Sequence, residues 1–241
     1  MSIFIHLNSR DSIDKNSPSN ASFNLSTTIV DSKSNTIELD VVSFPNAVTP
    51  VNSNYNTLVY EEDNASSTTT STLTQQNYSG SQLATELQTQ MNADTQETIT
   101  YSVSYNTQTK KLTIATDGKN FKITSASTCL HIIGVETAGM SAVSTNTALT
   151  NPVRLDGTAF VDVVSNLTTR NVVSSGLTNI LERIYLTASF GEVQFYIASS
   201  SRKMPLYNRD LKSLEFRLLD DRGNLWTLPE NQHISYSFKF S

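Results

Sequence analysis

The sequence predicts a mainly β fold in which a C-terminal strand pairs with strands formed much earlier in the chain. Apolar side chains alternate with polar ones at Ile234, Tyr236, Phe238 and Phe240, and this period of two is typical of a half-buried strand. Many other short segments have a strand-forming composition, and one segment has a clear helical period. Because a sheet completed this late needs earlier partners, we expect a non-local fold that closes on itself.

Strand candidates follow one another along most of the chain. In order, they span residues 3–7, 22–25, 36–44, 57–61, 70–75, 98–105, 111–116, 159–165, 184–189, 192–198, 214–218 and 234–241. Turn-forming residues at 220–224 separate the candidate at 214–218 from residues 225–228, which predicts a hairpin before the last strand. Pro45 and Pro50 bracket the end of one candidate, as expected at a sheet edge or a strand exit.

A helix is predicted over residues 80–93. Leu83, Leu87 and Met91 recur at a spacing of four and form one apolar stripe. Ser79 and Gln82 have the spacing of a capping box, which marks the start of the helix. We expect this helix to pack against a sheet rather than to bind a partner, and a second short turn over residues 127–133 is expected to end at Gly134.

Composition limits the classes of partner. The chain has 241 residues, of which 37% are hydrophobic, enough to bury a core. Its formal net charge of −5 argues against a dedicated binder of nucleic acid or anionic membranes, which needs clustered Lys and Arg. No segment approaches the roughly 18 apolar residues of a membrane span, and no signal peptide is predicted, so we expect the protein not to be secreted. Cys129 lies among apolar residues and is expected to be a buried, unreactive thiol.

Two stretches of low complexity, residues 64–74 and 137–151, are rich in small and hydroxylated residues. Both are expected to be surface loops or insertions. Neither is long or proline-rich enough to separate independent domains, so residues 1–241 are predicted to form a single domain.

The sequence contains no recognisable catalytic or cofactor-binding motif. His6, His131 and His233 are far apart, and none has the spacing of a metal-ligand pair. The acidic run at residues 61–63 could hold a calcium ion, whereas the one at residues 220–221 belongs to a turn, and solvated charge is the default for both. We therefore assign no catalytic, cofactor-binding or metal-binding residue, expect no cofactor and no enzymatic activity, and leave the binding residues unassigned.

Several strings in the sequence, taken in order, resemble one viral family. They are Asn8-Ser9-Arg10-Asp11, Ser43-Phe44-Pro45-Asn46, Asn77-Tyr78-Ser79 followed by the helix stripe, the hairpin from Ile99 to Ile114, Asn179-Ile180-Leu181-Glu182-Arg183-Ile184, Phe190-Gly191, Pro205-Leu206-Tyr207 and residues 211–224. Each string alone is common turn or strand chemistry, but their order is similar to that of the minor capsid, or penton, proteins of virophages, polinton-like viruses and related large DNA viruses. The chain departs from that pattern in its two low-complexity stretches and at Tyr196-Ile197-Ala198.

The resemblance implies a single jelly-roll β-sandwich of two four-stranded sheets, with one short amphipathic helix and inserted loops. It also implies a homopentamer that closes each five-fold vertex of an icosahedral virion and contacts the major capsid protein, a double jelly roll, and in some cases other minor capsid proteins. Assembly would then take place inside the host cell. A ring of five copies needs a head-to-tail interface whose rotation closes.

Two other classes of function remain open at this point. Jelly rolls also occur in carbohydrate-binding and receptor-attachment modules, which exposed aromatic residues such as Tyr55, Tyr60 or Tyr207 would favour. A β-sandwich hydrolase would need a close pair of carboxylates in a cleft, and the sequence shows no such pair.

Overall fold

The structure, a computed structural model, describes residues 3–13, 17–24, 36–63, 68–167, 171–173, 176–198, 203–206, 213–229 and 231–241. It divides the chain into two compact units. The jelly-roll unit comprises Met1–Val48 and Thr158–Ser241, and the inserted unit comprises Thr49–Gly157.

Among its described residues, the jelly-roll unit contains two large antiparallel sheets and one separate two-stranded sheet. The first has the order β1 (Ile3–Asn8), β17 (Ser235–Phe240), β3 (Thr36–Pro45) and β14 (Val193–Ile197), with the short β15 (Met204–Pro205) also on β3. The second has the order β13 (Ile180–Tyr185), β10 (Phe160–Ser165), β16 (Ser213–Leu219) and β2 (Asn20–Asn24). When these eight strands of the described residues are numbered from one to eight in chain order, the strand orders of the two sheets are 1-8-3-6 and 5-4-7-2. This is the connectivity of a jelly roll, so the predicted fold class is confirmed.

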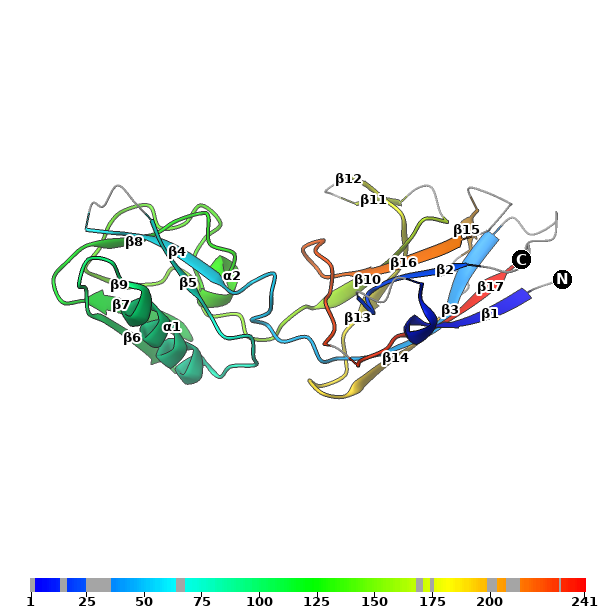
Figure 1. Cartoon of the computed structure of the whole chain (residues 1–241), viewed down its shortest axis with the longest axis horizontal. Helices are drawn as coiled ribbons and strands as arrows, with labels where there is room; N and C mark the ends of the chain where they lie inside the picture. Colours follow the sequence, from blue (N-terminus) through cyan, green and yellow to red (C-terminus); the bar gives the residue numbers. More distant parts are fainter. Residues whose placement is uncertain are drawn as a thin grey trace. The chain divides into compact units, whose positions relative to one another are not determined.

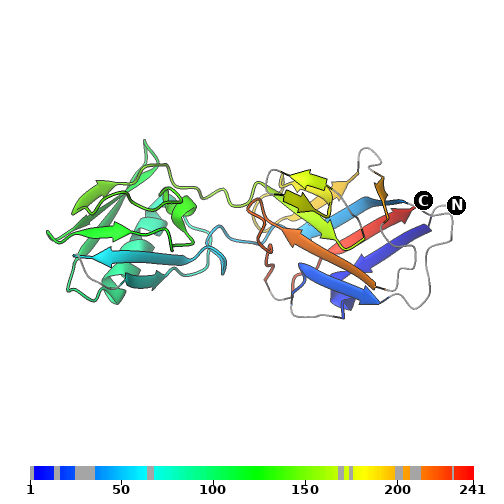
Figure 2. The ribbon, with the colours of Figure 1, turned by 90° about the horizontal axis from the view of Figure 1, so that it is seen from above.

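The last strand pairs with two strands formed much earlier in the chain, as the sequence predicts. Strand β17 lies between β1 and β3, with Phe238 opposite Ile5 and Leu39, and Figures 1 and 2 show β1 (blue) and β17 (red) side by side. The register shifts between Ser237 and Phe238, and this bulge leaves Asp40 as an extra residue in β3. The aromatic side chains of β17 therefore face the core while the strand joins both ends of the chain in one sheet.

One sequence prediction near this strand needs correction. The turn after β16 forms as expected, and the Asp220 carboxylate accepts hydrogen bonds from the backbone N–H groups of Arg222 and Asn224. Residues 225–228, however, do not continue as a strand, because the β-pairing between Leu225 and Leu219 is an isolated bridge. The side chains of Trp226 and Leu228 are buried in the core instead. The segment is therefore held by side-chain packing, and the second strand of the predicted hairpin does not form.

The described residues of the inserted unit form two small sheets and two helices. One sheet has the order β5 (Thr68–Thr72), β4 (Thr57–Glu62) and β8 (Phe121–Ile123), and the other has the order β6 (Tyr101–Asn106), β7 (Lys111–Thr116) and β9 (Asn146–Ala148). The helices are α1 (Gly80–Asp94) and α2 (Leu130–Ile133), which Gly134 ends in the left-handed conformation. Elsewhere, η1 (Ser9–Asp11) follows β1, and β11 (Asn171–Val173) pairs with β12 (Gly176–Thr178).

Helix α1 confirms the helical prediction. Leu83, Leu87 and Met91 are fully buried, and the Ser79–Gln82 capping box is complete. The helix packs on β5 and β6, so its apolar stripe belongs to the core of the inserted unit.

The structure divides the chain into two compact units, and the single domain over residues 1–241 stays a prediction. The strand candidates between residues 57 and 116 pair only with one another and with β8 and β9 among the described residues. They bury a second hydrophobic cluster, separate from the core between the jelly-roll sheets. The low-complexity stretches also contain regular structure, since β5 lies in residues 64–74 and β9 in residues 137–151, while residues 64–67 lie outside the described residues.

Candidate interaction surface

An apolar ridge runs along β14, the edge strand of the first jelly-roll sheet. The ridge consists of Val193, Phe195 and Ile197, which are 64%, 59% and 60% exposed. The intervening Gln194 is buried and Tyr196 packs against the core. In a usual surface strand the apolar side chains face the core, whereas here three apolar side chains face solvent and a polar one faces inward. Scattered exposed apolar residues are ordinary, but three at alternate positions of one edge strand form a continuous apolar surface and indicate a binding site.

The buried amide of Gln194 stabilises this inverted orientation. Its side-chain oxygen accepts hydrogen bonds from the backbone N–H groups of Thr187, at 2.9 Å, and Ala188, at 3.0 Å. Because a buried amide without partners would be costly, these bonds favour the orientation in which Gln194 points inward and its two apolar neighbours point outward. The sequence prediction placed a strand here but did not identify the ridge, and the signal available was a polar residue between large apolar ones.

The ridge lies beside β3 and at a free sheet edge. Val193, Phe195 and Ile197 are opposite Pro45, Ser43 and Val41. Among the described residues no strand pairs with the other side of β14. Its outward backbone N–H and C=O groups are therefore available to a further strand or another chain.

The opposite edge of the sandwich also exposes apolar side chains. Phe4, in the edge strand β1, is 52% exposed, and Ile13, which donates its backbone N–H to Ser22 of the edge strand β2, is 57% exposed. Together with the ridge, Tyr185 and Phe190, these are the large exposed hydrophobic residues of the jelly-roll unit within the described part of the chain. Apolar exposure is thus concentrated at the two edges of the sandwich.

The edge strand β13 of the second sheet adds an aromatic cluster. The rings of Phe160 and Tyr185 meet edge to face with centroids 5.9 Å apart, and the Arg183 guanidinium lies 3.8 Å from the centroid of Phe160. Both oxygens of the Asp162 carboxylate accept hydrogen bonds from Arg183 at 2.8 Å. Tyr and Arg in such fixed positions are frequent energetic centres of protein interfaces.

A hollow of about 450 Å³, lined by both polar and apolar residues, lies on the outer face of the first sheet. Its lining includes His6, Asn8, Asp11, Asp40, Ser43 and Ser237. The bulge in β3 brings the Asp40 carboxylate within 3.4 Å of the Ser237 hydroxyl. A hollow of this kind can accept polar side chains from a partner chain that covers the sheet.

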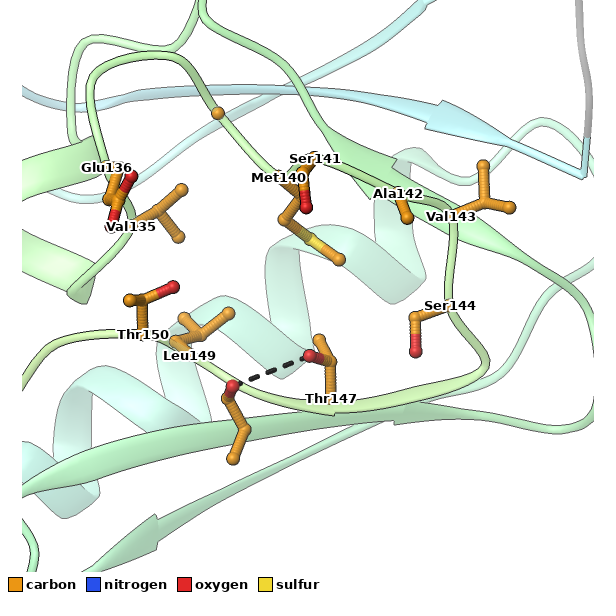
Figure 3. Close-up of a pocket in the computed structure, with 12 residues that line it drawn as sticks. Val135, Glu136, Met140, Ser141, Ala142, Val143, Ser144, Thr147, Leu149 and Thr150 are labelled. Atoms are coloured by element: carbon orange, nitrogen blue, oxygen red, sulfur yellow. Dashed lines mark hydrogen bonds between the residues drawn. The ribbon is translucent and has the colours of Figure 1, made fainter.

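A second hollow, of about 380 Å³, lies in the inserted unit. Figure 3 shows it between the loop that carries Met140 and the segment that carries Thr147 and Leu149, with the Met140 side chain pointing into the space. Its lining is mainly small and hydroxylated residues, and Glu136 is the one acidic or basic residue in it. The hollow therefore lacks the paired groups needed for acid–base catalysis.

In the acidic run at residues 61–63, Glu62 is hydrogen-bonded to other residues of the inserted unit. The buried Glu62 carboxylate accepts hydrogen bonds from the Thr69 hydroxyl, the Tyr101 hydroxyl and the backbone N–H of Gln96, at 2.9, 3.0 and 3.0 Å. Burial favours the neutral acid, but these bonds together with one from Thr95 outweigh it, and the pKa of Glu62 lies below its ordinary value. In the described part of the chain, no three His, Cys, Asp or Glu side chains gather in a group that could hold a metal ion.

The other residues considered from the sequence do not form a common site. His131 packs edge to face on Tyr55, and His6 and His233 lie elsewhere in the jelly-roll unit. Burial raises the pKa of the Cys129 thiol to about 12, and the predicted buried thiol is confirmed. No helix among the described residues has the length and apolar character needed to cross a membrane.

Two of the three aromatic residues that would favour glycan binding are buried. Tyr55 and Tyr60 are both buried in the inserted unit, and burial raises the pKa of Tyr60 to about 12. Tyr207 lies outside the described residues. The carbohydrate-binding alternative therefore loses two of the three residues that would support it.

The fold, rather than a reactive site, defines the class of protein that this chain resembles. No family model and no curated protein sequence matches the chain. Among solved structures, the chain is similar to the mavirus penton protein, known from a crystal structure of the selenomethionine-labelled protein. The TM-score is 0.51 at 10% sequence identity, and the alignment covers 100% of this chain and 99% of the other. The likeness thus shows a penton-like fold over the whole chain, of which the jelly roll is one of the two units.

Proposed function

We propose that this chain is a structural virion protein, a minor capsid or penton protein that forms a homopentamer at the five-fold vertices of an icosahedral capsid. The observation that carries the proposal is the jelly-roll connectivity, together with a full-length likeness to the mavirus penton protein. The resemblance in ordered sequence strings points to the same class independently of the structural comparison.

The character of the surface supports a role in assembly rather than in chemistry. Exposed apolar side chains lie at the two edges of the sandwich. In the described part of the chain, the hollow of the inserted unit has Glu136 as its one acidic or basic residue, and no three His, Cys, Asp or Glu side chains gather in a group that could hold a metal ion. We infer that the protein acts by binding other capsid subunits and not as an enzyme.

The proposed partners are other copies of this chain and a double-jelly-roll major capsid protein, and other minor capsid proteins can share the contacts. The proposed location is the capsid vertex, after assembly inside the host cell. Many weak contacts of one kind gain strength when they are repeated around a ring and across a shell.

Two measurements test this proposal. The mass of the purified chain should correspond to five copies of 26.6 kDa, about 133 kDa, either alone or on addition of the major capsid protein. Electron microscopy of particles assembled from the two proteins should show density for this chain at the vertices. Particles that close without it, together with a chain that stays at 26.6 kDa in their presence, would contradict the proposal.

A further inference from the structure

We propose that the β14 ridge binds the β1–β2 edge of a second copy of this chain, head to tail. The inference rests on the proposed function for its biological setting, but its argument comes from the two edges themselves. It assigns Val193, Phe195 and Ile197 to one side of the contact and Phe4 and Ile13 to the other.

The ridge has the size expected for the centre of a protein interface. An aromatic side chain such as Phe195 covers about 150–250 Å² when buried, and a ridge residue that is about 60% exposed leaves on the order of 100 Å² open. The three together present about 300 Å², comparable to the largest apolar patches on monomeric proteins, which are often functional. A standard interface covers about 800 Å² per partner and has an apolar centre with a polar rim. The ridge fits that centre, and the hollow lined by Asp40 and Ser237 lies on the same face of the sheet.

The opposite edge offers a complementary surface on the same chain. Strands β1 and β14 are the two ends of one sheet, and both have an unpaired outer side among the described residues. Phe4 is 52% exposed on β1, and Ile13 is 57% exposed beside β2. A partner of unrelated sequence would explain exposure at one edge, whereas a second copy explains exposure at both.

The arrangement of the two surfaces determines the kind of assembly. Because they are different surfaces at opposite edges, the contact cannot be a two-fold one in which the same patch meets itself. A contact of this type repeats from copy to copy and ends in a ring if the rotation closes. The proposed homopentamer is such a ring.

The test uses one charged substitution at each edge of the full chain. Phe195→Glu places a charge in the ridge, and Phe4→Glu places one at the opposite edge, where it lies across from Lys239 and is tolerated in the fold. Val143→Glu is the matched control, because Val143 is 48% exposed but belongs to the inserted unit. Circular dichroism and thermal melts establish that each variant is folded, and Ile197→Glu provides a second ridge variant.

Sedimentation velocity then measures the assembly of each protein. Wild type and Val143→Glu should form the same oligomer, and each edge variant alone should sediment at 26.6 kDa. Loss of a central interface residue should weaken the contact by at least about 30-fold. An equimolar mixture of the two edge variants retains one intact contact per pair, so it should form a species of twice that mass, about 53 kDa.

Other outcomes would overturn the inference, and they are separate from failure of the proposed function. If Phe195→Glu assembles like wild type, if the mixture stays at monomer mass, or if wild type is itself monomeric at all concentrations, the ridge is not the contact. The penton role would survive the first two results if wild type still occupies particle vertices. A ridge-dependent oligomer that never occupies vertices would instead support the contact and contradict the penton role.

Discussion

The ring of Phe216 on β16 stacks on the ring of Phe238 on β17, with centroids 4.3 Å apart and planes within 12° of parallel. The two residues belong to different sheets of the jelly roll, and both are fully buried. Tyr236 stacks on Phe216 at 5.3 Å as well. These aromatic side chains therefore connect the two layers at the centre of the core, in addition to the backbone pairing within each sheet.

Replacing Phe238 by alanine should lower the free energy of unfolding by about 3–5 kcal/mol, because it removes a buried ring and leaves a cavity between the sheets. Urea denaturation followed by circular dichroism measures the change. Phe190→Ala is the matched control, since Phe190 is 49% exposed, and it should change the free energy by less than about 0.5 kcal/mol. Equal effects of the two substitutions would show that the stack does not contribute to stability.

The last strand and the helix were predictable because both have a strong local period. The alternation from Ile234 to Phe240 and the stripe from Leu83 to Met91 each correspond to one buried face. The division into units was not predictable in this way, since a strand such as β6 has the same local pattern whether it pairs within an insertion or within the jelly roll. Pairing partners are a non-local property.

The ridge was missed for a related reason. Alternation in β14 shows only that two faces differ, and the usual rule would place Val193, Phe195 and Ile197 in the core. The buried hydrogen bonds of Gln194 decide the opposite orientation. Those bonds come from Thr187 and Ala188 in the preceding loop, whose conformation could not be inferred from residue types.

Replacing Leu83 by aspartate should unfold the inserted unit, because it places an unpaired charge in the core under α1. Hydrogen exchange should show loss of protection within Thr49–Gly157, while β17 and its neighbours remain protected, since each unit has its own hydrophobic cluster. Ser81→Asp is the control, at an exposed position in the first turn of the same helix. Equal loss of protection in both units would indicate that they fold as one domain.

Deleting residues 238–241 should prevent soluble folding. The deletion removes half of β17, which lies between β1 and β3, and with it the backbone hydrogen bonds between Thr36 and Ser241. It also removes Phe238 and Phe240 from the core. Expression followed by a urea titration checks the outcome, and Ser241→Ala is the control. Cooperative unfolding of the truncated chain would show that the strand is peripheral.

The buried Glu62 carboxylate should make stability depend on acid pH. Its pKa in the folded protein lies below the ordinary value of 4.5, so the unfolded chain takes up the proton first as the pH falls. The stabilisation by ionised Glu62 is therefore complete above about pH 4.5 and is lost as the pH drops through the folded pKa.

The variant Glu62→Gln should consequently be less stable at pH 7, by roughly 1.5–3 kcal/mol, because it loses hydrogen bonds to a charged acceptor. Between pH 4.5 and pH 3 its unfolding free energy should fall less steeply than that of wild type. Urea titrations of both proteins at half-unit pH intervals measure the two slopes, and Glu61→Gln, at a half-buried neighbouring position, controls for a change in net charge. Parallel curves for wild type and Glu62→Gln over this range would mean that the hydrogen bonds from Thr69, Gln96 and Tyr101 do not stabilise the ionised form.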